Sequence, residues 1–416
     1  MRGDLGILAA APTAFDQAGG EPASGGDYAR RDGGPTVAVR RLVLTDFRGY
    51  AAARLATTAG PVVLTGPNGA GKTNLLEAIS FLAPGRGLRR ARLGEVDRRR
   101  RDETGALGAP AAGPWAVHAR LATPAGEVEI GTGREAAEGS ERRTLRIDGA
   151  PARSQGALSD HLAVVWLTPA MDRLFVEGSS ARRRFLDRLV HGFDGEHASR
   201  LNAYEQAMRE RARLLRDGPM DQSWLAALED TMATTGAAIA AARREVVARL
   251  DQACAEAVGP FPAARLALAG EVETWLESLP ALAAEDRIRS RLAELRGLDR
   301  ESGTTQLGPH RSDFRVRHAA TGMPAAEGST GEQKALLIAI VLAHARLQLA
   351  QRGRTPVLLL DEVVAHLDPL RRGALYGELR RLGAQAWLTG TDAELFESLR
   401  GAAQFFAVAD ASLAPA

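Results

Sequence analysis

The sequence has little cysteine and no long apolar run. Cys254 is the single cysteine among 416 residues. One cysteine excludes an internal disulfide and fits a reducing compartment. The residues around Cys254 have helical apolar spacing, so we expect its thiol to pack in the core. No apolar run approaches the roughly 18 residues of a membrane span. The short patch Leu5–Ala11 is preceded by Asp4 and a single arginine, which does not fit a secretion signal. We expect a cytoplasmic protein without a membrane contact.

Lysine is also scarce. Lys72 and Lys334 are the only two lysines, against 51 arginines. Because arginine serves wherever a generic cation is needed, a lysine at position 72 indicates a need for a compact point charge rather than a planar guanidinium. Lys72 lies in GPNGAGKT, Gly66–Thr73, which follows the apolar run Pro61–Thr65 and opens a helical stretch. Random order would produce about 0.002 matches to this G-x-x-x-x-G-K-[ST] pattern.

This motif predicts a phosphate-binding loop. Glycines let the backbone wrap around phosphate oxygens, and the helix N-terminus adds backbone N–H groups and its positive dipole end. Lys72 is expected to reach the β- and γ-phosphates, and the Thr73 hydroxyl is expected to bind Mg²⁺. The nucleotide-binding set of this loop is Gly66, Pro67, Asn68, Gly69, Ala70, Gly71, Lys72 and Thr73.

The bulk composition is that of an ordinary soluble protein, with 45% hydrophobic and 25% charged residues. A net charge of +2 provides no whole-chain argument for nucleic-acid binding. Two arginine runs, Arg98–Arg101 and Arg182–Arg184, are local exceptions. The first run is compatible with a solvated loop and with a patch that neutralises DNA phosphates. The second could contact DNA or brace the junction of two lobes.

Periodicity divides the chain. Residues 1–36 are rich in Gly, Ala, Pro and Asp without a period, which predicts a disordered tail or a misplaced start. Alternating and buried-type runs predict strands at 37–44, 61–65, 115–121, 127–130, 143–147, 163–167, 313–318, 356–360 and 385–389. Between about 197 and 297 the period becomes helical, and a stripe from Leu225 to Val258 predicts a helix of about 35 residues. Residues 332–349 are apolar nearly all round and predict a buried helix.

Two further segments complete the expected site. Val357–Leu360 is followed by Asp361 and Glu362, the pattern of a strand whose end holds Mg²⁺ and polarises the attacking water. Ser329–Gln333 begins the buried helix ahead of this pair, and its small residues suit a second anion site at a helix N-terminus. An ordinary N-cap at Ser329 or Thr330 is the simpler alternative.

The order of these motifs resembles the ABC-type ATPase heads, and among them the RecF family of SMC-like proteins. The resemblance runs from about 37 to 410. Departures are Ser180 in place of a usual proline, Pro169–Asp172 in place of P-E-D-L, and Thr389-Gly390-Thr391 where transporter-type heads carry a switch histidine. The segments that carry the resemblance are Val39–Tyr50, Gly66–Ala78, Gly178–Asp187, Gly308–Arg311 and Leu359–Leu375.

The resemblance implies an α/β fold: an ABC-type P-loop ATPase head, with a mixed sheet, helices and an antiparallel β part, and a short α-helical lobe inserted in it. The implied divisions are a tail (1–36), an N-terminal head part (37–192), the helical lobe (193–300) and a C-terminal head part (301–416). The resemblance implies that the catalytic residues are Lys72, Asp361 and Glu362. It also implies that the metal ligands are Thr73 and Asp361. The implied ATP contacts outside the loop are Ser329, Thr330, Gly331, Glu332, Gln333 and Asp368.

The resemblance further implies two ATP molecules held between the heads of a homodimer, each by Lys72 and Asp361 of one copy and Ser329 and Gly331 of the other. Such a protein binds single-stranded, double-stranded or gapped DNA, works with RecO and RecR to load recombinase, and serves gap repair, replication restart and the SOS response. Its DNA-stimulated ATPase is slow and acts as a switch. The alternatives are a nucleotide-binding subunit of an ABC transporter, which is usually shorter and carries the switch histidine, and an ATPase coupled to a nuclease domain, for which the chain has no room.

Overall fold

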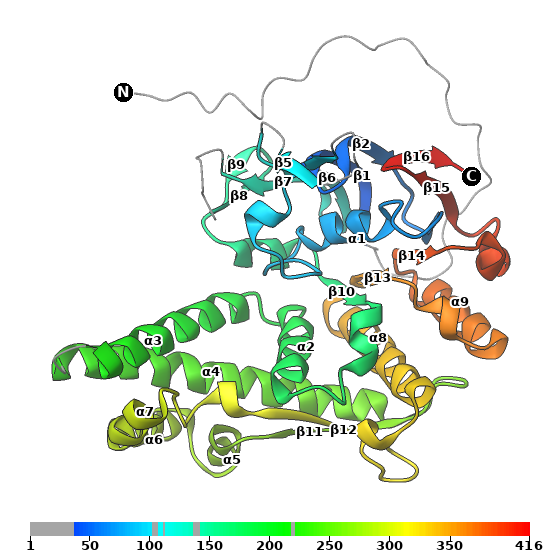
Figure 1. Cartoon of the computed structure of the whole chain (residues 1–416). Coiled ribbons are helices and arrows are strands. Elements are labelled where there is room, and N and C mark those ends of the chain that lie inside the picture. The colour runs from blue at the N-terminus through cyan, green and yellow to red at the C-terminus, as the bar shows by residue number, and fades with distance from the viewer. Residues whose placement is uncertain (1–36, 102–106, 111–112, 136–141, 218–220) are drawn as a thin grey trace, which may run out of the picture. The chain divides into compact units, whose positions relative to one another are not determined.

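The computed structural model describes residues 37–101, 107–110, 113–135, 142–217 and 221–416, and only the backbone within 99–110. These residues belong to one unit, Gly34–Ala416. The expected tail 1–36 lies outside the described residues. Two six-stranded sheets and a set of helices make up the unit (Figure 1).

The first sheet carries the strands with buried-type sequences. Its order is β10-β13-β14-β3-β15-β16, parallel except for the last pair. Parallel strands point their carboxyl ends to the same edge, where ligands bind in open α/β sheets. The bounds are β3 (Val62–Thr65), β10 (Val164–Leu167), β13 (Val357–Leu360), β14 (Ala386–Gly390), β15 (Gln404–Ala409) and β16 (Ser412–Pro415).

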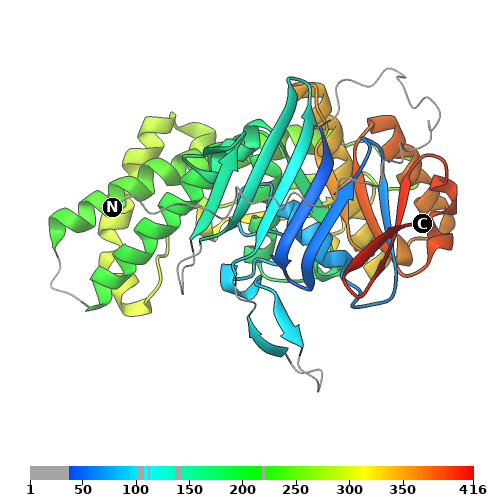
Figure 2. The same ribbon diagram turned by 90° about the horizontal axis from the view of Figure 1, so that it is seen from above.

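The second sheet is an antiparallel meander in the order β2-β1-β6-β7-β8-β9. Seen from above, its blue and cyan strands lie side by side (Figure 2). The alternation of apolar and polar residues that predicted strands here is the pattern of a sheet with one buried face. The bounds are β1 (Ala38–Phe47), β2 (Tyr50–Ala56), β6 (Ala116–Thr123), β7 (Gly126–Arg134), β8 (Arg143–Ile147) and β9 (Ala150–Pro151); β4 (Arg99–Arg101) and β5 (Leu107–Pro110) form a separate pair.

Helix α1 (Lys72–Ser80) lies between the two sheets (Figure 1). Its Leu75, Leu76 and Ile79 are fully buried in a core that both sheets share. The parallel strands contribute alternate residues to this core, because successive side chains of a strand point to opposite faces. The helix that begins at the phosphate-binding loop is therefore enclosed on two sides.

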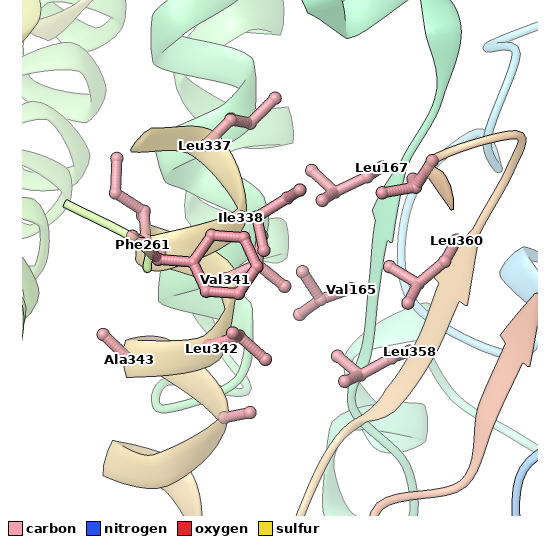
Figure 3. Close-up of a cluster of buried hydrophobic side chains, with 14 of the residues drawn as sticks. Val165, Leu167, Phe261, Leu337, Ile338, Val341, Leu342, Ala343, Leu358 and Leu360 are labelled. Atoms are coloured by element: carbon pink, nitrogen blue, oxygen red, sulfur yellow. The ribbon is translucent and has the colours of Figure 1, made fainter. Parts of the chain in front are cut away.

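The opposite face of the parallel sheet packs against α8 (Thr330–Arg352), with α2 (Ser179–His191), α4 (Gln222–Cys254) and α9 (Pro369–Leu382). Figure 3 shows Ile338, Val341 and Leu342 of α8 facing Val165 and Leu358 of the sheet. α8 is long and apolar enough to cross a membrane, but 78% of its apolar window is buried inside the fold. Its composition is explained by burial on all sides.

Residues 197–302 are mainly helical. α3 (His197–Asp217) and α4 pack together with α5 (Glu271–Ser278), α6 (Ala281–Glu294) and α7 (Arg296–Ser302). Arg211 of α3 is fully buried and forms ion pairs with Glu229 and Asp299. Removing one partner of such a group is costly, because a buried charge is left uncompensated.

The predicted elements agree with the structure where periodicity is strong. α4 has 33 residues, against the expected length of about 35. Cys254 packs in the core and is 3% exposed, and burial raises the pKa of its thiol to about 12. The expectation of helix throughout 197–297 was incomplete: β11 (Ala264–Ala269) pairs antiparallel with β12 (Asp313–His318). Strands β2, β4, β5, β9, β15 and β16 were also missed. The division of the chain into lobes stays a prediction.

Candidate nucleotide-binding site

The loop between β3 and α1 requires its glycines for two separate reasons. Gly66 has φ 150°, and a Cβ there would lie 2.0 Å from the Val408 carbonyl oxygen. Gly71 has φ 113°, and its Cβ would lie 2.7 Å from the Tyr50 hydroxyl. Both backbones are left-handed or nearly so, a conformation that side chains disfavour. The loop therefore cannot accept other residues at these positions without moving its neighbours.

Lys72 reaches back over this loop. Its Nζ donates to the carbonyl oxygens of Gly66 (2.6 Å) and Pro67 (3.0 Å). Burial lowers the pKa of the ammonium group, while the nearby carboxylates of Glu362 and Asp361 raise it. The residue is 5% exposed. The arrangement holds a positive charge at the point where the loop's backbone curls.

Asp361 joins three neighbouring strand ends. It follows β13, and its carboxylate accepts from the hydroxyls of Thr73 (3.0 Å) and Thr389 (2.8 Å). Thr73 belongs to α1, which follows β3, and Thr389 ends β14, which lies between β3 and β13. Burial raises the Asp361 pKa, and the two hydroxyl donors oppose this shift. The sheet order thus brings together residues that lie far apart in the sequence.

The Thr73 and Asp361 oxygens fit a Mg²⁺ ion. Magnesium prefers oxygen ligands in octahedral geometry at about 2.1 Å, which places neighbouring ligands roughly 3 Å apart. The observed separation of 3.0 Å has that value. Within the described residues no cluster of three or more His, Cys, Asp or Glu side chains could hold a metal without further ligands. Phosphate oxygens and water would have to supply the remaining ligands.

Glu362 has an unusual backbone held by Thr389. Its φ is 53°, and its N–H donates to the Thr389 hydroxyl at 2.9 Å. A non-glycine residue in this region costs about 1–3 kcal/mol and persists only where its surroundings hold it. Thr389 is fully buried and bonds both acidic residues. Sequence reasoning named Thr389 only within the segment that replaces the switch histidine and assigned it no role in the site, although its place near the end of the buried strand β14 was a usable signal.

The turn Asp46–Tyr50 supports the loop from the antiparallel sheet. Arg48 forms a bidentate pair with Glu77 of α1 (2.7 and 2.8 Å), and Arg89 contacts the same carboxylate at 2.7 Å. Glu77 is fully buried. The Tyr50 hydroxyl donates to the Gly71 carbonyl oxygen at 3.2 Å. These contacts position the first turn of α1 and were not predicted.

The segment Ser329–Gln333 begins α8 as an exposed cap. Ser329 and Glu332 form a reciprocal capping box, and Ser329, Thr330, Gly331 and Glu332 are all exposed. The simpler expectation of an N-cap at Ser329 is therefore correct, and it does not conflict with anion binding. Gln333 is buried; its Nε2 donates to the Gly328 carbonyl oxygen, while its Oε1 has no partner.

This cap lies away from the phosphate-binding loop of the same chain. Lys334, one turn into α8, pairs with Asp172, which follows the edge strand β10. Three strand spacings, about 14 Å in sum, separate β10 from β3. Across the described part of the chain, no hydrogen bond or ion pair links 328–333 to 66–73. The structure thus does not bring the two predicted halves of the site together.

Asp368 and Thr391 are the remaining predicted positions. Asp368 caps α9 by accepting from the Arg371 N–H at 2.9 Å, and it is exposed. Thr391 follows β14 and is also exposed. Neither residue contacts the loop within the described residues.

A phosphate-binding helix between two sheets, with an acidic pair two strands away, is the arrangement of an ABC-type ATPase head. A Pyrococcus furiosus SMC head domain with an extended coiled coil has the same fold, at a TM-score of 0.51, 15% identity, and 92% and 96% coverage of the two chains. A solved RecF structure described as the recombination mediator RecF-ATPrS in the RecFOR pathway is more similar: TM-score 0.78, 22% identity, and coverage of 92% and 100%. At these identities the likeness concerns the fold.

Sequence similarity narrows the class further. The model of the RecF/RecN/SMC N terminal domain family matches residues 38–412. The "DNA replication and repair protein RecF" of Mesorhizobium japonicum is 52% identical over 380 residues, which cover 91% of this chain and 97% of that protein. The RecF of Brucella suis is 50% identical over 382 residues, with 91% and 96% coverage. The chain belongs to this family, and within it to the RecF proteins.

Proposed function

We propose that the chain is an ATP-binding protein of DNA replication and repair, working as a recombination mediator. The observation that carries the proposal is the joined set Thr73, Asp361, Thr389 and Glu362 beside Lys72, in a chain that matches RecF proteins over nearly their whole length. A RecF-ATP complex with a TM-score of 0.77 supports ATP as the nucleotide. The transporter alternative has no support, because the similar full-length proteins are repair proteins.

The proposed roles follow the site's chemistry. Backbone N–H groups of 66–73 and the Lys72 ammonium bind the β- and γ-phosphates, in place of the carbonyl contacts that Lys72 makes now. Thr73 and Asp361 hold Mg²⁺, which neutralises phosphate charge when bound. Glu362 orients and polarises the attacking water, and Thr389 fixes its backbone. These residues would support slow, DNA-stimulated hydrolysis that acts as a switch.

A second copy of the chain completes the site in this proposal. Ser329, Thr330, Gly331, Glu332 and Asp368 are exposed, and within the described residues none of them contacts its own loop. Exposed N–H groups at the start of a 23-residue helix suit the γ-phosphate held by another subunit. The buried Gln333 would help to orient this cap through its hydrogen bond to the Gly328 carbonyl oxygen. ATP then joins two heads, so dimerisation depends on the nucleotide.

The proposed partners are DNA, in single-stranded, double-stranded and gapped forms, and RecO and RecR. The support is that the chain belongs to the RecF proteins and that two solved RecF structures of similar fold are of mediators in the RecFOR pathway. Gap repair, replication restart and SOS induction, in the cytoplasm, are the processes in which such a protein would act.

Two variants test the proposal. Glu362→Gln keeps the ATP contacts but removes the base-like carboxylate, so it should accumulate ATP-bound dimers in sedimentation experiments. Lys72→Ala should remain monomeric and lose ATP-dependent DNA binding. DNA affinity is measured on duplex, single-stranded and gapped substrates, with and without ATP. If Glu362→Gln is only monomeric in the presence of ATP, the shared site is rejected. If Lys72→Ala binds DNA as well as the wild type does, DNA affinity does not depend on the nucleotide.

A further inference from the structure

A cavity of about 520 Å³ lies outside the nucleotide site, between the start of α2, the middle of α3 and the loop 303–311. Three arginines line it, one from each of these segments: Arg183, Arg209 and Arg311. Ser179 and Thr304 add hydroxyl groups. None of its lining residues is acidic. The cavity is therefore a concave surface with a concentrated positive charge.

The charge in this cavity is only partly neutralised. Arg183 uses Nη1 to donate to the Ser179 hydroxyl (2.8 Å) and the Ser312 carbonyl oxygen (2.6 Å). Within the residues that the structure describes, its Nε and Nη2, and the whole Arg311 side chain, have no hydrogen bond or ion pair. Arg209 has a single long contact of 3.5 Å with Glu205. These donors remain available to an anion.

His310 at the base of the cavity does not supply a ligand. Its Nε2 donates to the Thr305 carbonyl oxygen (2.9 Å), so Nδ1 accepts from the Tyr204 hydroxyl (2.7 Å). Both ring nitrogens are therefore engaged in hydrogen bonds within the fold. Burial lowers the pKa of His310, and the charges of Arg311 and Arg183 lower it further. Arginine is thus the only cation that the cavity presents.

The positive surface continues beyond the cavity along α2. Arg184 follows Arg183 in the helix, and among the residues that the structure describes its guanidinium bonds only the Ser180 hydroxyl. Arg182, in contrast, is paired with Asp313 at 2.8 Å and braces α2 against β12. The arginine run therefore has one bracing member and two that face open positive surface.

We propose that the cavity binds phosphodiester groups of a DNA strand, which Arg209 and Arg311 hold over the floor made by Arg183, and that Arg184 continues the contact. The inference rests on the proposed DNA-binding function and specifies where it occurs. A polymer is favoured over a free nucleotide because the positive surface extends past one cavity. The lining also lacks an aromatic platform for a base and a carboxylate for a ribose.

The test uses the full-length protein with ATP and Mg²⁺ and a short fluorescent DNA duplex. Arg209→Gln/Arg311→Gln is compared with Arg249→Gln/Arg291→Gln, a pair of exposed arginines with the same charge change that do not line the cavity. Binding is followed by anisotropy over a salt series. Each lost phosphate contact should reduce the salt slope by about 0.9, which at 0.1 M salt corresponds to roughly eight-fold weaker binding per arginine. The control pair should keep the wild-type slope.

Three outcomes decide the proposal. A slope that falls by about 2 for the cavity pair alone, and returns in Arg209→Lys/Arg311→Lys, supports it. An unchanged slope and affinity in a variant that melts like the wild type overturns it. Loss of inorganic tripolyphosphate binding with unchanged DNA binding also overturns it, since the cavity would then serve a free anion. Failure of the wild-type protein to bind DNA would instead reject the proposed function itself.

Discussion

Thr389→Val removes one hydroxyl from the centre of the nucleotide site without changing the side chain's shape. That hydroxyl donates to Asp361 at 2.8 Å and accepts from the Glu362 N–H at 2.9 Å, and it is fully buried. An unsatisfied buried donor costs about 1–3 kcal/mol, and a hydrogen bond to a charged group contributes about 1.5–3 kcal/mol. The Glu362 backbone also loses the contact that holds its positive φ.

If about 2–3 kcal/mol of this loss falls on the transition state, ATP hydrolysis should slow roughly 30- to 150-fold. Single-turnover hydrolysis with saturating ATP, Mg²⁺ and DNA measures the effect directly. ATP affinity should change far less, because Lys72 and the loop are untouched. Thr389→Ser keeps the hydroxyl and is the matched control. A wild-type rate for Thr389→Val, in a protein that melts normally, would refute the role assigned to Thr389.

Two further predictions concern buried ionisable groups. Burial lowers the pKa of His344 to about 4. His344 in the unfolded chain has an ordinary pKa of about 6.5 and is therefore protonated at a higher pH than in the fold. The free energy of unfolding should fall as the pH drops from 6.5 toward 4, by about 2 kcal/mol between pH 7 and pH 5. His344→Gln should remove that part of the pH dependence in urea unfolding; equal losses in both proteins would contradict it. Glu77→Gln should destabilise the fold by about 3 kcal/mol, because two arginines lose their buried partner. The exposed control Glu127→Gln should change stability by less than about 0.5 kcal/mol, and similar values for both would contradict the prediction.

Sequence patterns predicted those parts of the fold that are determined by residues close together in the chain. The residues that determine the loop around Lys72 lie within eight consecutive positions, so the motif predicted both the loop and the helix that follows it. Strand β13 and the buried helix α8 were visible as apolar runs, because burial on both faces leaves no polar period. Asp361 was expected near the loop because two acids at the end of a buried strand, in a chain with a phosphate-binding loop, are the usual Mg²⁺-binding pattern.

Contacts between distant segments could not be predicted in this way. β11 pairs with β12 across α5–α7, and its Ala-rich sequence has weak strand propensity of its own. The bracing role of Arg182 depends on its contact with Asp313, which lies 131 positions further along the sequence. Arg98, in the other arginine run, is paired with Asp46 at 2.7 Å. The side chains of 99–101 lie outside the described residues, so a DNA contact by that run stays a prediction.

The order of strands in the parallel sheet has a consequence for synthesis. β3 carries the phosphate-binding loop and comes early in the chain, but its two neighbours, β14 and β15, are among the last strands. The loop is also closed by late residues, since Gly66 packs on the Val408 carbonyl and the Ala411 N–H bonds the Ala70 carbonyl oxygen. A nascent chain therefore leaves the ribosome with an unpaired central strand until nearly all of it has been translated. A sheet formed by such non-local pairing folds slowly, so the newly synthesised protein must be protected from aggregation before it can bind a nucleotide.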